Sequence, residues 1–169
     1  MNAIDILTDM AGRPREAAEA LRDSLTPAVL NAHPLGHPNS VAWLLWHAGR
    51  EIDIQVAHLS GEDEVWTAQG FRERLALGDA GDGLGYGQSV DEARAIRTDD
   101  AAALLDYLDA ATETLTGYLL GLSDADLDAV VDENWDPPVT RGVRLVSIID
   151  DAAQHVGQAA YAAGMPELG

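Results

Sequence analysis

Asp151 and His155 are the residues of this sequence whose types and spacing point most directly to chemistry. They lie four residues apart in an apolar segment, residues 143–164, so in a helix their side chains would share one face. His47 lies in the other strongly apolar segment, residues 40–59. Helical proteins build metal sites from side chains on facing helices, so these three residues are candidate metal ligands. The alternative is that they are buried polar groups satisfied by hydrogen bonds.

Four segments with the apolar periodicity of a helix would position these side chains. They are residues 2–24, 40–59, 98–122 and 143–164. Pro14 could interrupt the first helix, because proline suits a first helical turn better than a helix interior. Asn39 or Ser40 is expected to cap the second helix, which should end before Gly61. The sequence therefore predicts an all-α protein.

The connection between the second and third helices is long and polar. Residues 61–88 contain a cluster of five glycines, but no strand precedes it as in a phosphate-binding βαβ unit, so we reject a phosphate-binding role. An ordinary loop is expected, and a flexible lid over the bundle mouth is the alternative. Residues 90–97 predict a short helix. No alternating run is long enough to predict a sheet, although Pro137 and Pro138 favour an extended segment before the last helix.

The composition limits the classes of partner. The formal net charge is −19 and all ten basic residues are arginine, and such an acidic surface repels phosphate backbones and anionic lipid. We therefore expect no nucleic acid and no membrane as a partner. The chain has no cysteine, so any thiol chemistry needs a thiol from outside. Asp5 and Asp9 do not suit a secretory signal, and no apolar run approaches about 18 residues, so we expect a single cytoplasmic domain.

Several long motifs carry a resemblance to a known family. They are NSVAWLLWHAGREID, GYGQSVDEARAIR, WDPPVTRGVRLVSIIDD and QHVGQAAYAAG. The chain resembles the DinB-like superfamily, and in particular an actinobacterial branch related to mycothiol-dependent maleylpyruvate isomerase-like metalloenzymes. The resemblance implies one all-α four-helix bundle over residues 1–169, with a long crossover between helices 2 and 3. It also implies a divalent metal, often zinc or nickel, near one end of the core.

The resemblance assigns the metal ligands to His47, Asp151 and His155, because relatives use a histidine of the second helix and two residues four apart on the last. Asp151 is one methylene shorter than the glutamate of some relatives, so it is open whether it reaches the metal directly, through water or not at all. Two histidines and one carboxylate leave a position open, as in catalytic zinc sites, and would also suit iron(II). Gln158 could hydrogen-bond a ligand or simply lie on the helix surface.

The resemblance favours a metal-dependent thiol S-transferase that transfers a mycothiol-type cosubstrate to an electrophilic small molecule. Arg50, Arg141 and Arg144 are candidate cofactor-binding residues for an anionic thiol, on charge and proximity in the sequence alone. The first alternative is a metal-binding protein without thiol chemistry, either a hydrolase that uses water or a stress-associated binding protein. The second is an assembly module, since the Ala-rich helices could pack closely in a homodimer.

Overall fold

The computed structural model describes residues 1–165, so the last four residues of the predicted domain lie outside the described range. It is mostly helical, which confirms the predicted class. The longest helices of the described residues are α1 (Ala3–Glu19), α3 (Val41–Ser60), α7 (Ala101–Leu120) and α8 (Arg141–Ala163). None of the helices in this part of the chain combines the length and the apolar character that crossing a membrane requires.

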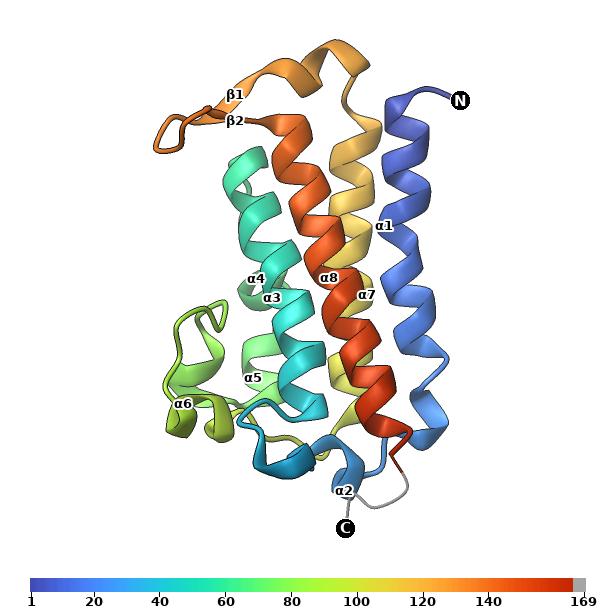
Figure 1. The fold of residues 1–169 in the computed structure, drawn as a ribbon, viewed down its shortest axis with the longest axis vertical. Helices are drawn as coiled ribbons and strands as arrows, with labels where there is room; N and C mark the ends of the chain where they lie inside the picture. The colour runs from blue at the N-terminus through green and yellow to red at the C-terminus, as the bar shows by residue number, and fades with distance from the viewer. Residues whose placement is uncertain (166–169) are drawn as a thin grey trace.

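The four long helices lie side by side around one apolar core. α1 and α3 each pack against both α7 and α8. In Figure 1, α1 and α8 run downwards while α3 and α7 run upwards, so α3 and α7 are parallel. A parallel pair cannot be joined by a short turn, because the chain must return along the full length of the helix. The long connection over residues 61–100 makes that return.

Shorter elements join and flank these helices. They are η1 (Arg22–Ser24), α2 (Pro27–Leu30), η2 (Pro34–Gly36), α4 (Val65–Ala68), α5 (Phe71–Leu75), η3 (Gly78–Gly81), α6 (Val90–Ala95), η4 (Asp124–Asp128), β1 (Val130–Asp132) and β2 (Val139–Thr140). The glycine cluster is thus part of a folded segment that contains η3 and precedes α6, in the lower left of Figure 1.

α3 is the central helix for the site, and its ends match the prediction. The Ser40 side chain accepts a hydrogen bond of 3.1 Å from the backbone N–H of Trp43 and so caps the first turn. Gly61 ends the helix with a φ of 77°, a left-handed conformation that glycine adopts without strain. All residues from Val41 to Arg50 are buried, so every side of this half of the helix contacts protein.

Two segments differ in detail from what the sequence indicated. α1 continues through Pro14 and ends at Glu19, and Pro14 is buried against the rest of the core. Tertiary packing therefore outweighs the backbone hydrogen bond that proline removes. The segment before α8 forms a small antiparallel sheet, in which Val130 pairs with Thr140. Strands this short cannot show a recognisable alternation in a sequence.

Candidate metal centre

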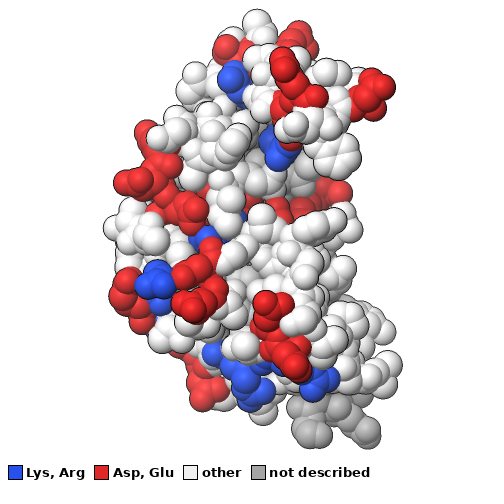
Figure 2. Space-filling model, turned by 90° about the vertical axis from the view of Figure 1, so that its left-hand side faces the viewer, with Lys and Arg blue, Asp and Glu red and all other residues white. Residues whose placement is uncertain are grey.

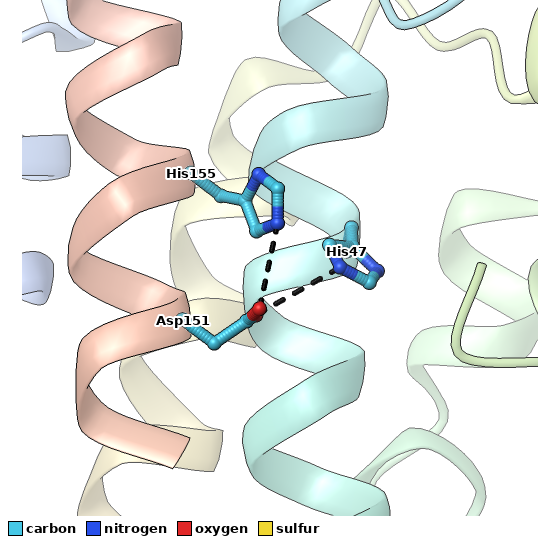
Figure 3. A group of neighbouring side chains, drawn as sticks. All are labelled: His47, Asp151 and His155. Carbon is cyan, nitrogen blue, oxygen red and sulfur yellow. Dashed lines mark ion pairs between the residues drawn. The ribbon is translucent and has the colours of Figure 1, made fainter. Parts of the chain in front are cut away.

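His47, Asp151 and His155 converge between α3 and α8 (Figure 3). α8 contributes Asp151 and His155 from successive turns, and α3 contributes His47. Nε2 of His47 lies 3.8 Å from Oδ2 of Asp151, and Nε2 of His155 lies 3.5 Å from Oδ1 of Asp151. The structure therefore brings together the three residues that the sequence predicts as metal ligands.

The donor set suits a divalent metal. One ligand atom from each residue lies within 4.8 Å of the others. Tetrahedral bonds of about 2.0–2.2 Å would place ligand atoms roughly 3.3 Å apart, so a small contraction would complete the coordination. Oδ2 of Asp151 is buried, and no residue in the described range gives it a hydrogen bond. A buried carboxylate oxygen without a hydrogen-bond donor is suited to a cation, and the three ligand atoms are close enough together to share one.

The backbone of the glycine-rich segment, residues 78–87, determines which nitrogen of His47 carries the proton. Nδ1 of His47 donates a hydrogen bond to the carbonyl oxygen of Leu84. Because a carbonyl oxygen can only accept, Nδ1 carries the proton and Nε2 keeps its lone pair towards Asp151. Metal-binding histidines are commonly oriented in this way by an acceptor behind the ring.

A side chain on α8 does the same for His155. Nδ1 of His155 lies 2.9 Å from Oε1 of Gln158, which accepts its hydrogen bond. Nε2 of His155 is then the atom with the free lone pair, and it is the atom nearest to Asp151. Gln158 is thus exposed on the helix surface and also contacts a candidate ligand.

The two imidazoles differ in their affinity for protons. Burial lowers the pKa of His47 below its ordinary value, and the neighbouring His155 adds to this effect. A hydrogen bond to Asp151 raises the pKa of His155, and the negative charge of Asp151 adds to the rise. In the metal-free protein a proton therefore binds His155 before His47. That proton occupies the region between His155 and Asp151 that a metal would use.

Trp43 holds the plane of the buried imidazole. Its ring stacks on His47 with centroids 4.5 Å apart and an interplanar angle of 21°. The same ring meets His155 edge-on, at 6.0 Å and 82°. Trp43 is buried, and its Nε1 donates a hydrogen bond of 2.8 Å to Gln88 in the connection between α3 and α7. The indole thus fixes both the imidazole ring and the segment that covers it.

The glycine-rich segment is held against α3 by side chains of that helix. Nε1 of Trp46 donates to the carbonyl of Gly81 at 3.3 Å. The guanidinium of Arg50 donates to the carbonyls of Asp82 and Gly83, at 2.8 and 3.1 Å. These contacts place the next carbonyl, that of Leu84, against Nδ1 of His47, on the side of the ring away from Asp151. Sequence reasoning treated this segment as a loop, because the direction of a carbonyl group has no signal in the residue types.

Gly85 allows the segment to approach His47 closely. A Cβ added at Gly85 would lie 3.0 Å from Nδ1 of His47, and equally close to the rings of Trp43 and Trp46. The residue also has a φ of 93°, which side-chain-bearing residues rarely adopt. Gly85 is therefore a supporting residue of the site that the sequence did not single out from its neighbouring glycines.

The predicted cofactor-binding arginines are spread over the structure. Arg50 is 1% exposed, and its guanidinium lies 2.8 Å from the carboxylate of Glu64. Arg141 donates to a backbone carbonyl at 3.1 Å. Arg144 forms an ion pair of 3.0 Å with Asp132 and lines a cavity. Binding of a thiol by these arginines stays a prediction, and the contacts of Arg50 favour a structural role for that residue.

Two cavities lie beside the candidate ligands. The first, of about 350 Å³, is lined by His47, Asp151 and His155 and by residues of the glycine-rich segment. The second, of about 510 Å³, lies between α3, β1 and the N-terminal part of α8. Glu51 and Tyr86 line both cavities, so the second cavity adjoins the first. A molecule in the second cavity would lie next to the candidate metal site.

Comparisons with known proteins agree with this fold. A crystal structure of a conserved protein from Enterococcus faecalis is 35% identical, matches with a TM-score of 0.86 and covers 96% of each chain. No curated protein matches the chain. The family model of the DinB superfamily matches residues 12–159, most of the chain. The chain belongs to the DinB superfamily.

Proposed function

We propose that the protein is a divalent-metal-dependent thiol S-transferase, with His47, Asp151 and His155 as the metal ligands. The observation that carries the proposal is the convergence of two imidazole Nε2 atoms on the carboxylate of Asp151, whose buried Oδ2 receives no hydrogen bond from residues 1–165. Zinc or nickel is the expected metal, and iron(II) would also suit the two histidines and one carboxylate. We further assign α1, α3, α7 and α8 to the four-helix bundle of DinB-like proteins.

The residues of the chain supply the orientation of the site. Leu84 and Gln158 hold the two histidines with their lone pairs towards Asp151. Three protein ligands leave a position for an exogenous group, and the cavity of about 350 Å³ gives access to it. A bound metal would act as a Lewis acid that lowers the pKa of a thiol or a water molecule.

The thiol must be a separate molecule, because the chain contains no cysteine. A mycothiol-type cosubstrate follows from the resemblance to the actinobacterial branch, and the electrophile would be a small organic molecule. The adjoining cavity of about 510 Å³ offers space for that second substrate. The two cavities therefore match a reaction between two small molecules.

A hydrolase is the second candidate, and Glu51 is the observation that favours it. Its carboxylate lines the same cavity as the three candidate ligands, where it could accept a proton from an attacking water molecule. The hydrolase would turn over without any thiol.

The two candidates separate in one assay. We would incubate the metal-loaded protein with monobromobimane as the electrophile, with and without mycothiol, and follow thiol consumption and hydrolysis of the electrophile. Because monobromobimane also reacts with thiols without a catalyst, conjugation is counted only as the rate above that of the same mixture without protein. The transferase requires thiol conjugation that is lost after metal chelation and in His155→Ala, but retained in Gln154→Ala. Gln154 is a suitable control because its side chain bonds to Asp150 on the exposed face of α8. Metal-dependent turnover without thiol would support the hydrolase, and conjugation that persists after chelation would refute the transferase.

A further inference from the structure

The second cavity combines apolar walls with a single unmatched carboxylate. Ile54 and Leu59 on α3 and Val131 on β1 contribute apolar surface. Glu51 lies at the border with the metal cavity, where a group bound in either cavity could reach it. The charge and the apolar surface of this lining determine what kind of molecule it would bind.

The charges of the lining argue against an anion. Arg144 is engaged by the carboxylate of Asp132 at 3.0 Å, and it also donates to Oε1 of Gln55 at 3.2 Å. Gln55 in turn donates from its amide nitrogen to Glu51. Arg144 is thus paired with Asp132, while the hydrogen-bond donor that contacts Glu51 is a neutral amide. Two carboxylates, those of Glu51 and Asp132, therefore face one arginine in the lining, a surplus of one acidic group.

Glu51 is only partly exposed, and this has an electrostatic consequence. Burial raises the pKa of Glu51. The ionised carboxylate is therefore held in surroundings that disfavour it. A positive group placed beside Glu51 would relieve this cost, whereas an anion would increase it.

The mouth of the cavity presents two exposed aromatic rings. Trp135 is 65% exposed and Tyr86 is 91% exposed, although large aromatic side chains usually bury more of their surface. The faces of such rings attract organic cations. In Figure 2, which views this side of the molecule, the surface is hollowed below the upper lobe, and both acidic and basic side chains lie around the hollow. The net charge of −19 would steer cations towards the protein.

We propose that this second cavity binds an apolar organic cation, with its positive nitrogen beside Glu51 and its apolar body between Trp135 and α3. The identification of this cation with the electrophilic substrate rests on the proposed function, because it assumes that a reaction takes place at the adjoining metal site. The electrophile would then be an amine-bearing apolar molecule, not an organic anion.

The test uses three probes of similar size and different charge: phenethylammonium, phenethyl alcohol and hydrocinnamate. Each is titrated into the full-length protein by calorimetry after chelation of metal, so that the amine cannot bind by coordination. We expect phenethylammonium to bind about tenfold more tightly than the alcohol, with hydrocinnamate weakest. Glu51→Gln should abolish this preference, and Trp135→Ala should weaken binding of the cation. Glu62→Gln, on an exposed residue outside this lining, should leave the preference unchanged.

Equal or tighter binding of hydrocinnamate would overturn the proposal, and so would an unchanged preference in a folded Glu51→Gln variant. Binding of none of the probes would do the same. Metal content is measured on the same preparation before chelation, so a failure of the metal site and a failure of the cation cavity give separate results.

Discussion

Gly85 lies so close to His47 that a Cβ at this position would be 3.0 Å from Nδ1 of the imidazole. The contact is possible because Gly85 has a φ of 93° and carries no side chain. It lets the preceding carbonyl, that of Leu84, accept the proton of Nδ1. A glycine in the connection between α3 and α7 thereby orients a candidate metal ligand on α3.

Substitution of Gly85 should therefore weaken metal binding. In Gly85→Ala the new Cβ would displace His47 or the glycine-rich segment, and we expect metal affinity to fall by about 10–100-fold, as for other residues that orient ligands. The matched control is Gly87→Ala. Gly87 also has a positive φ, of 73°, but a Cβ there would meet no described atom within 4 Å. Competition with a chromogenic chelator measures both variants, and equal affinities for the two would show that the contact with His47 is unimportant.

Gln158 should matter for metal affinity although it is not a ligand. Gln158→Leu removes the acceptor for Nδ1 of His155, so the imidazole loses its fixed orientation. We expect metal affinity to fall by about tenfold or more. Gln154→Leu, on the same helix but bonded to Asp150 at 2.7 Å, should retain the affinity of the unmodified protein. If both variants bind metal equally well, Gln158 has no supporting role.

Metal affinity should increase with pH. The hydrogen bond and the charge of Asp151 raise the pKa of His155, so a proton competes with metal at this nitrogen even above the ordinary pKa of histidine. Burial lowers the pKa of His47, which is already neutral in that range. Raising the pH removes the proton from His155 and so strengthens binding, whereas lowering it has the opposite effect.

Calorimetry in buffers of different ionisation enthalpy can test this source of protons. The protein should release protons when metal binds at a pH at which His155 is still partly protonated, and they should come from His155. Resonances of the two imidazoles followed by NMR during a pH titration of the metal-free protein would identify the residue. A higher pKa for His47 than for His155 would contradict the assignment.

Arg50 should stabilise the fold, whatever its part in binding a thiol. It is 1% exposed and pairs with Glu64 and Asp53. Arg50→Ala would remove the cation beside the buried carboxylate of Asp53 and the partly exposed carboxylate of Glu64, and we expect the free energy of unfolding to fall by about 3 kcal/mol. Arg94→Ala removes an exposed arginine that donates a hydrogen bond to the carbonyl of Gly36. This control should change the free energy of unfolding by less than about 1 kcal/mol. Similar urea midpoints for the two variants would show that the buried pairs contribute little.

The helices could be predicted where local signals mark them. Ser40 and Gly61 gave the ends of α3 correctly, because a capping hydroxyl and a left-handed glycine act within one turn. Pro14 left the continuity of α1 open, because its cost is offset by burial that depends on other helices. The strands β1 and β2 escaped prediction because they contain only three and two residues.

The convergence of the three candidate ligands could also be predicted. Both their spacing and the family motifs place them on helices that face each other. The helical period alone places Asp151 and His155 on one face of a helix, and His47 was identified from its position in the second helix. The groups that orient them could not be predicted equally well. Leu84 acts through a backbone carbonyl and Gly85 through the absence of a side chain, and both depend on contacts across more than thirty residues of sequence.

Metal content measures the central claim most directly. Purified protein, reconstituted with zinc, nickel or iron(II), should contain about one equivalent of metal by elemental analysis. Each of His47→Ala, Asp151→Ala and His155→Ala should lose that metal while keeping its helical circular dichroism, and Gln154→Ala should retain it. A folded protein that takes up no metal after reconstitution, or variants that bind as much metal as the unmodified chain, would contradict the account and leave the three residues as a buried polar cluster.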